Sequence, residues 1–419
     1  MKNFLAFAII VSFLVSCNTA SNESRAQEYQ SGYDPVRIQR IKDLQQELID
    51  DGLMGSSHVV IYKDGRMIYN QIVNSEHPDD KEITDETIFP IWSMSKPITT
   101  VATMILFEEG KFMLDDPVGK YIPELNSLQC IDNEGNIYPC KNKITIRDLL
   151  THESGYGYYP EVFEGKFSDL GDFVTKIAEI PLSFEPGTEH QYGLSNAILG
   201  RLIEVLSGQG LYEFLKDRIF DPLEMSDTDF DLTADEREHF QPLFRLQDTS
   251  IGYYTTEFDE LSYQPGSKVQ LGGEGLVSTT SDYCNFCEML LNNGVFHGKR
   301  ILSPTSISWM HQPQTDAPSG LPGFRSGFTL CHLTDPITDG ALSPEGIFGW
   351  GGYHSTWFWI DQKNDLFGLI MTRMTGPELF SMFKKFRIAT YQAVYCLLYT
   401  SPSPRDCVSH LVCRLLLVR

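Results

Sequence analysis

The chain has 419 residues, a formal net charge of −23 and a hydrophobic content of 42%. This length is enough for one large globular domain with a full core, and the composition is not that of a disordered chain. The charged residues are scattered, as on a solvated surface. The negative charge argues against a nucleic-acid-binding function, because the phosphate backbone would be repelled.

The first sixteen residues have the pattern of an export signal. A lysine precedes an apolar run that is too short and too early for a membrane span. The run ends in LVSC, which resembles the lipobox of bacterial lipoproteins and makes Cys17 the expected lipidated N-terminus. An ordinary signal peptide with an incidental cysteine is the alternative. With residues 17–35 as a polar tether, we expect an exported protein, lipid-anchored to a bacterial membrane and facing the periplasm or the cell surface.

The elements expected in the first half of residues 36–395 are helical apart from one hairpin. Residues 36–52 carry apolar side chains at helical spacing. Residues 58–73 form two alternating runs around Asp64-Gly65, which is a strong hairpin signal. A helix is expected from about Ser93 to Gly110, and short helices and long loops follow to about residue 260.

Strand patterns return in the last third of this region. Residues 327–333 and 349–374 supply alternating and aromatic-rich runs, and residues 377–395 form a closing helix. This order predicts an α+β fold. Its mainly antiparallel sheet is built from both chain ends, flanked by helices, and carries a mostly helical inserted subdomain.

The composition changes abruptly after this closing helix. The stretch CLLYTSPSPRD, which begins at Cys396, back-translates to DNA that resembles a transposon-derived sequencing adapter. We therefore expect residues 396–419 to be an assembly artefact, with a genuine tail as the alternative, and we assign them no function.

Four cysteines of the domain stand in two pairs. Cys130 and Cys140 flank a turn-rich segment and are candidates for a small disulfide loop in an oxidising compartment. Cys284 and Cys287 lie three apart in a predicted helix. No second CxxC accompanies them, so we expect buried packing cysteines rather than a metal site.

Ser93 and Lys96 form an S-x-x-K motif at the start of a predicted helix. Residues three apart share a helical face, so the ammonium can reach the hydroxyl of Ser93, whereas Ser95 points elsewhere. A serine hydroxyl becomes a good nucleophile only when a neighbouring base takes its proton. A capping serine with a surface lysine is the alternative for the motif alone.

Further segments follow this motif in a familiar order. They are ITIRDLLTHESGYG, FEPGTEHQYGLSN, GGEGLVSTTSDY and GWGGYHSTWFWID. Together they resemble the serine β-lactamase-like family: class C β-lactamases, related esterases and D-amino-acid peptidases, over roughly residues 36 to 395. The resemblance implies that Ser93, Lys96 and Tyr192 are catalytic, and it implies no cofactor and no metal.

Two departures from the β-lactamase pattern favour the esterase branch. Leu194 stands where that pattern has an asparagine, and Asn196 is too far along to be assumed equivalent. Trp350-Gly351-Gly352 replaces Lys-Thr-Gly, as in the esterase branch, which removes a cation that would meet a substrate carboxylate. The resemblance further implies that the two glycines let the strand approach the substrate, and that the N–H groups of Ser93 and Tyr353 form an oxyanion hole.

These features predict a serine hydrolase that forms an acyl-enzyme, with esters of small or medium acyl groups as substrates. A β-lactamase or a D-amino-acid peptidase such as a DD-carboxypeptidase is the alternative within the class. A catalytically silent penicillin-binding-like lipoprotein is the alternative outside it. We expect His152 to be structural and His190 and His354 to line the cleft without a catalytic role. The expected partners are a small ester, amide or lactam and the membrane, not nucleic acid.

Overall fold

The computed structural model describes residues 32–77, 80–159, 162, 166–240, 244–247, 250–253, 268–315, 319–375 and 379–394. The predicted signal peptide, Cys17 and the segment 396–419 lie outside these residues. Within them, no helix combines the length and apolar character needed to cross a bilayer.

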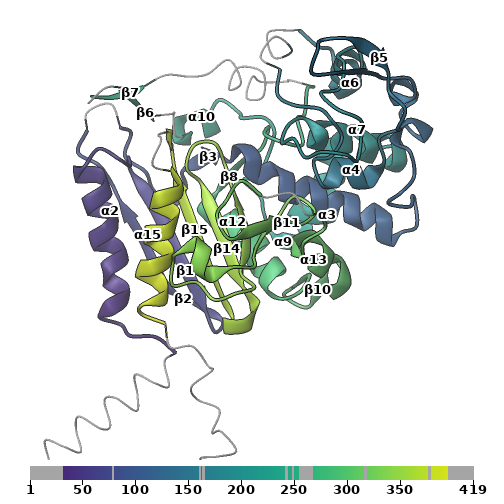
Figure 1. The fold of residues 1–419 in the computed structure, drawn as a ribbon. Coiled ribbons are helices and arrows are strands. Elements are labelled where there is room, and N and C mark those ends of the chain that lie inside the picture. The colour runs from purple at the N-terminus through teal and green to yellow at the C-terminus, as the bar shows by residue number, and fades with distance from the viewer. Residues whose placement is uncertain are drawn as a thin grey trace, which may run out of the picture.

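A seven-stranded antiparallel sheet forms the centre of the fold, in the order β11-β12-β13-β14-β15-β1-β2 (Figure 1). Strand β1 pairs with β2 on one side and with β15 on the other, so both ends of the chain build one sheet. The predicted α+β fold is therefore confirmed. The strands are β1 (Ser57–Lys63), β2 (Arg66–Val73), β11 (Phe324–Ser326), β12 (Cys331–Leu333), β13 (Phe348–Gly351), β14 (Trp357–Asp361) and β15 (Leu366–Thr372).

The hairpin between β1 and β2 turns at the predicted Asp-Gly pair. Asp64 has φ 50° and Gly65 has φ 77°, both in the left-handed region. A two-residue turn of this kind matches the right-handed twist of the flanking strands and favours Asp or Asn followed by Gly. The Asp64-Gly65 turn therefore determines that β1 and β2 pair as a hairpin at this edge of the sheet.

Helices α2 (Arg40–Asp50) and α15 (Leu379–Tyr391) lie side by side against one face of the sheet (Figure 1). The sheet residues on this face alternate with those on the other. Trp359 belongs to the apolar cluster that includes Phe386 of α15, whereas its neighbour Phe358 belongs to the larger cluster on the opposite side. Every residue of β14 is buried, as expected for a strand that is covered on both faces.

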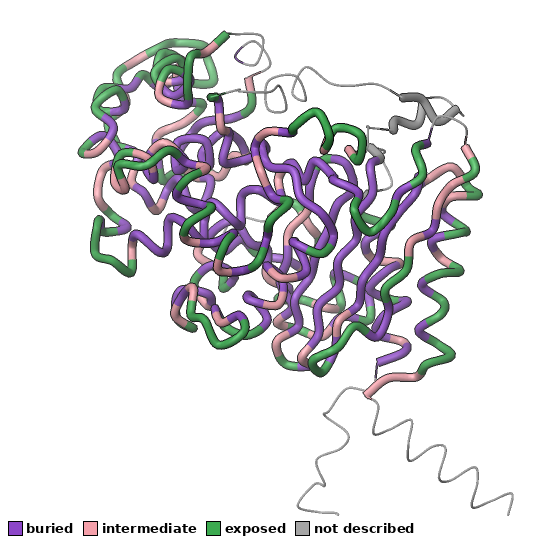
Figure 2. The backbone as a smooth tube through the Cα atoms, turned by 180° about the vertical axis from the view of Figure 1, so that it is seen from behind, coloured by how far each residue is buried: buried purple, intermediate pink, exposed green. Residues whose placement is uncertain are grey.

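The helical region covers the opposite face. Helix α12 (Thr280–Leu291) packs there, with the ring of Tyr283 centred 5.5 Å from that of Phe358. Cys284 and Cys287 are buried, unpaired cysteines of this helix, as predicted. Helix α3 (Ser95–Glu108) runs through the core, and each residue from Ser95 to Leu106 is buried. Figure 2, seen from behind, shows buried residues concentrated in the centre of the molecule and exposed residues on its outer segments.

The other described helices complete the helical region and its connections to the sheet. They are α4 (Ile146–Leu150), α6 (Leu170–Ile177), α7 (Ser195–Ser207), α8 (Leu211–Leu215), α9 (Asp221–Leu223), α10 (Glu236–His239), α13 (Pro304–His311) and α14 (Pro336–Asp339). The 3-10 turns are η1 (Arg37–Gln39), η2 (Trp92–Met94), η3 (Val118–Lys120), η4 (Pro123–Leu125) and η6 (Gln362–Asn364), and η5 (Lys216–Phe220) is a π-helix.

The other strands form small ribbons of two or three. Strand β3 (Ile88–Pro90) pairs with β8 (Val277–Thr279), and this ribbon leads directly into η2 and α3. The others are β4 (Gln129–Ile131) with β5 (Ile137–Pro139), β9 (Val295–Phe296) with β10 (Lys299–Arg300), and β6 (Phe244–Gln247) with β7 (Ser250–Tyr253) and β16 (Met374–Thr375).

Candidate active site

Ser93 lies in the 3-10 turn η2, and not in an α-helix that starts at Ser93 as the sequence suggested. The preceding residue, Trp92, has φ 46°, a left-handed conformation that costs energy for a bulky residue. The Trp92 indole is buried and donates a hydrogen bond of 2.7 Å to Nδ1 of His354. This contact holds the turn in place, and α3 begins only at Ser95.

The second serine of the motif has a structural partner. The backbone N–H of Leu276 donates to Oγ of Ser95 at 3.1 Å, and Ser95 is fully buried. Its side chain therefore anchors the segment after residue 271 to α3. The prediction that Ser95 points away from Ser93's surroundings is confirmed.

The structure brings Ser93, Lys96 and Tyr192 together. The Tyr192 hydroxyl lies 2.7 Å from Oγ of Ser93, and Nζ of Lys96 lies 3.3 Å from the same oxygen. The Lys96 ammonium also lies 4.7 Å from the centre of the Tyr192 ring, within the range of a cation–π contact. The Ser93 oxygen is thus in contact with two groups that can carry its proton, Tyr192 and Lys96. This is the geometry that activation of a serine nucleophile requires.

Tyr192 is placed by the turn that precedes α7. The N–H of Gln191 donates to the carbonyl of His152 at 2.8 Å. On the other side, a Cβ added at Gly193 would lie 2.3 Å from the carbonyl oxygen of Tyr156, so the turn needs glycine there. The LLTHESG turn therefore supports Tyr192 through its backbone, in agreement with the structural role expected of His152.

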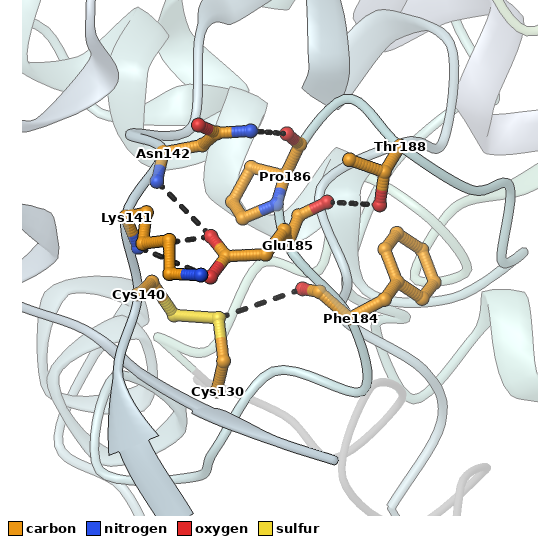
Figure 3. The surroundings of a disulfide bond; sticks show 8 residues. All are labelled: Cys130, Cys140, Lys141, Asn142, Phe184, Glu185, Pro186 and Thr188. Carbon is orange, nitrogen blue, oxygen red and sulfur yellow. Dashed lines mark hydrogen bonds between the residues drawn. A yellow bond between two sulfur atoms is a disulfide. The ribbon is translucent and has the colours of Figure 1, made fainter. Parts of the chain in front are cut away.

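The disulfide between Cys130 and Cys140 fastens the β4–β5 hairpin near the segment that leads to Tyr192. The backbone N–H groups of Lys141 and Asn142 donate to the Glu185 carboxylate at 2.9 Å and 3.0 Å (Figure 3). Glu185 and the two sulfur atoms lie within 4.8 Å of one another, but both sulfurs are used in the disulfide. This cluster is therefore a structural fastening and not a metal site.

Lys96 has further neighbours that the sequence did not indicate. Its Nζ donates to the Tyr158 hydroxyl at 2.9 Å and to the Gly273 carbonyl at 2.7 Å, and it lies 3.6 Å from Oε2 of Glu274. Desolvation of its hydroxyl, and then the nearby Glu274 carboxylate, raise the pKa of Tyr158 well above its usual value. Tyr158 is therefore a neutral hydroxyl at physiological pH. The signals in the sequence were weak: one acid among glycines in GGEG, and one of several tyrosines in YGYY.

Neutral histidines lie near this group. His152 lines the cavity beside Ser93, and its ring centre is 4.9 Å from that of Tyr192. Burial and the Lys96 charge hold the pKa of His152 well below its ordinary value. His190 also lines the cavity, as expected, and burial lowers its pKa. His354 is fully buried against Trp92 and is not among the described residues of the cavity wall, so that expectation is wrong.

The end of strand β13 forms the wall opposite Tyr192. Trp350, Gly351, Gly352 and Tyr353 all line the cavity that contains Ser93. A Cβ at Gly352 would lie 2.4 Å from the carbonyl oxygen of Ile91, so only glycine allows the strand end to approach this closely. The pairing of the Ser93 and Tyr353 N–H groups in an oxyanion hole stays a prediction.

The segment of the chain after Tyr192 differs from the β-lactamase pattern at Leu194 and Asn196. Leu194, where the β-lactamase pattern has asparagine, is buried in the core. Asn196 is buried too, and its amide nitrogen lies 3.5 Å from the backbone carbonyl of Lys96. Asn196 therefore supports α3 rather than meeting the Ser93 hydroxyl, and it does not take the place of the asparagine in the β-lactamase pattern.

The cavity above Ser93 has a volume of about 320 Å³ and a mostly apolar wall. Leu321, Trp357 and two phenylalanines of α15, Phe380 and Phe383, supply much of this wall. Among the described residues that line it there is no arginine or lysine. Because both lining histidines favour the neutral form, the wall offers an acyl or alkyl group an apolar surface and offers a carboxylate no cation.

The antiparallel sheet, the helical insertion and the Ser–Lys–Tyr group place the molecule in the β-lactamase/transpeptidase-like fold class. The Beta-lactamase family model matches residues 41–390. The chain therefore belongs to the β-lactamase family of serine hydrolases.

Curated relatives and solved structures agree with this assignment. Esterase EstB of Burkholderia gladioli is 27% identical over 371 residues, which cover 79% of this chain and 90% of that protein. Lovastatin esterase of Penicillium rubens is 29% identical over 376 residues, or 77% of this chain and 90% of that protein. The structure of EstCE1, a hydrolase with promiscuous acyltransferase activity, has a TM-score of 0.73 at 23% identity, covers 85% of this chain and 98% of its own, and supports the fold.

Proposed function

We propose that this protein is a carboxylesterase-type serine hydrolase that acts on esters of small or medium apolar acyl groups. The observation that carries the proposal is the position of the Ser93 hydroxyl, which meets Tyr192 and Lys96 at the edge of an apolar cavity. The esterase relatives support this choice of substrate.

The proposed reaction is acyl transfer through Ser93. Tyr192 reacts as its phenolate: the Ser93 oxygen attacks the ester carbonyl while its proton passes to Tyr192, and the carbon–oxygen bond to the alcohol breaks as Tyr192 gives that proton to the leaving oxygen. Water then attacks the acyl carbon while its proton passes to Tyr192, and the bond between Ser93 and the acyl group breaks as Tyr192 returns that proton to the Ser93 oxygen, which releases the acid. The donors near Ser93, including the predicted N–H of Tyr353, stabilise the oxyanion formed in each step.

The cavity wall favours this substrate class over β-lactams and D-alanyl peptides. Those substrates carry a carboxylate, which binds best where a fixed cation receives it. Trp350 occupies the place of the family's lysine, and the described cavity wall has no arginine or lysine. An uncharged ester has no carboxylate and therefore needs no such cation.

A hydrolysis panel tests the proposal. We expect kcat/KM for a p-nitrophenyl butyrate or hexanoate to exceed that for a chromogenic cephalosporin and for a D-Ala-D-Ala peptide by about 100-fold, which corresponds to about 2.7 kcal/mol. Ser93→Ala should remove the ester activity. A preference for the peptide or the cephalosporin would move the protein to the alternative substrates, and no activity in the whole panel would favour the silent binding protein.

We also propose that the mature protein is lipid-anchored through Cys17, on the basis of the LVSC motif. Bacterial cells that express the full chain should incorporate an alkyne-labelled fatty acid into the protein. Cys17→Ser should abolish this label, whereas Cys331→Ser, at a buried cysteine of β12, should keep it. Label on the Cys17→Ser protein would contradict the anchor.

A further inference from the structure

The carboxyl group of Glu274 is buried beside Lys96. The Glu274 side chain is 4% exposed, and its Oε2 atom lies 3.6 Å from Nζ of Lys96. Its Oε1 atom is buried and has no hydrogen-bond partner among the described residues. A buried carboxylate with incomplete hydrogen bonding destabilises a fold, so stability does not explain this residue.

Glycines bring Glu274 to this position. The Thr99 hydroxyl donates to the Gly272 carbonyl at 2.6 Å, and a Cβ at Gly272 would lie 2.8 Å from that same hydroxyl oxygen. A Cβ at Gly275 would lie 2.9 Å from the Leu271 carbonyl oxygen. The segment therefore packs directly on α3, and the glutamate is the one residue of GGEG that has a side chain to present there.

The surroundings of the Lys96 nitrogen suit a cation. The Gly273 carbonyl at 2.7 Å and the Glu274 carboxylate at 3.6 Å have no hydrogen to donate, so both favour a nitrogen that carries hydrogens and positive charge. The face of the Tyr192 ring adds a further attraction. An ammonium has three hydrogens, which is enough for Gly273, Tyr158 and Ser93 to receive one each.

We propose that Glu274 is a positioning residue that keeps Lys96 as an ammonium in the resting enzyme, so that Tyr192 and not Lys96 accepts the Ser93 proton. This inference rests on the proposed function. Tyr192, as the phenolate that the ammonium stabilises, takes the proton while the Ser93 oxygen bonds to the acyl carbon. Lys96 keeps its three hydrogens throughout, and Tyr192 returns the proton to the leaving alcohol.

The electrostatics of the pair are consistent with this role. Burial raises the pKa of the Glu274 carboxyl, and the Lys96 charge opposes the rise. The Lys96 charge therefore favours the ionised form of Glu274. The other titratable groups that face Lys96 are Tyr158, Tyr192 and the neutral His152.

The test is the pH dependence of the reaction in Glu274→Gln, which keeps the shape and removes the charge. Rates of ester hydrolysis and of Ser93 labelling by a fluorophosphonate are measured from pH 5 to 10. Glu274→Asp serves as the charge-retaining variant. Asp282→Asn serves as the matched control, because Asp282 is a buried acid whose carboxylate binds Asp227 and Thr228 instead. Circular dichroism and thermal unfolding check that each variant is folded.

We expect Glu274→Gln to lower kcat/KM about tenfold or more and to move the alkaline limb of the profile about one unit to lower pH, because the ammonium loses its proton earlier without the carboxylate. In Glu274→Asp the alkaline limb should lie closer to its wild-type pH, and in Asp282→Asn it should lie at the wild-type pH.

Two results would overturn the inference. A shift of the acid limb to lower pH with an unmoved alkaline limb in Glu274→Gln would mean that neutral Lys96 is the base, and no shift of either limb in a folded variant would mean that Glu274 is only structural. Failure of the proposed function looks different: the wild-type protein would neither hydrolyse esters nor label at Ser93.

Discussion

The hydroxyl of Tyr192 lies 2.7 Å from Oγ of Ser93, although the two residues are 99 positions apart in the chain. The backbone bond between Gln191 and His152 and the tight contact of Gly193 with Tyr156 hold the phenol there. A proton can pass directly between two oxygens at this distance.

Tyr192→Phe removes this proton carrier and leaves the shape of the site. We expect kcat for ester hydrolysis to fall by about 10²–10⁴-fold with KM little changed, the size of effect usual for a general acid–base group. Steady-state kinetics on p-nitrophenyl butyrate measures the change. Tyr121→Phe, at a tyrosine that bonds to Asp116, is the control and should retain activity. Wild-type kcat in Tyr192→Phe would show that another group carries the proton.

Gly352→Ala should displace the strand end from Ser93. The added methyl group would meet the Ile91 carbonyl oxygen at 2.4 Å, and a backbone atom cannot move aside as a side-chain tip can. We expect kcat/KM to fall by about 10²-fold, as when an oxyanion donor is lost.

Gly171→Ala is the matched control for this change. Its methyl group would contact the flexible guanidinium of Arg201 at 3.2 Å and Asp169 at 3.2 Å, and none of these residues is among the described residues that line the cavity. It should retain activity. If Gly352→Ala is as active as Gly171→Ala, the close approach of the strand is not needed for catalysis.

Removal of the disulfide should weaken the fold near Tyr192. The bond closes a loop with a sequence separation of 10. Loop-closure entropy predicts that replacing Cys130 and Cys140 by serine lowers the free energy of unfolding by about 2–3 kcal/mol. Chemical denaturation under non-reducing conditions measures this loss. Equal stability of the double variant and the wild type would show that the contacts of Glu185 alone hold the hairpin.

A pair of histidines makes stability depend on pH. Burial, and then His332, lower the pKa of His311 to about 3, and Nδ1 of His311 lies 3.0 Å from Nδ1 of His332. Because the unfolded chain takes up this proton near pH 6.5 and the folded one does not, stability falls as pH drops from 6.5 towards 3, by about 1.4 kcal/mol per pH unit for this group.

His311→Phe tests this dependence, since it keeps the ring that stacks on Phe348 at 4.0 Å. Denaturation midpoints at several pH values should show a smaller loss of stability on acidification in the variant than in the wild type. A slope that equals that of the wild type would exclude His311 as its source.

Much of the site could be predicted from the sequence, because its motifs are local and their order matches a known family. The i, i+3 spacing singled out Ser93 and Lys96, and the resemblance supplied Tyr192 and the Trp350-Gly351-Gly352 strand. The hairpin at Asp64-Gly65 followed from turn chemistry alone. The alternation of apolar residues located the strands but not their order in the sheet.

The rest depends on contacts that sequence patterns do not encode. The 3-10 turn at Ser93 relies on the bond between Trp92 and His354, which are 262 positions apart. Tyr158 and the turn that carries Glu274 meet Lys96 over separations of 62 and more than 170 positions. Such contacts follow from the packing of the whole domain, so a single sequence gave only weak signals that either residue belongs to the site.

The most direct test of the account is intact-mass analysis after treatment with a fluorophosphonate. We predict one adduct on the wild-type protein, located by peptide mapping at Ser93. Ser93→Ala should carry no adduct, and Ser95→Ala, at the serine that anchors Leu276, should keep it. An adduct that persists on Ser93→Ala, or its absence from a folded wild-type protein, would contradict the assignment of Ser93 as the nucleophile.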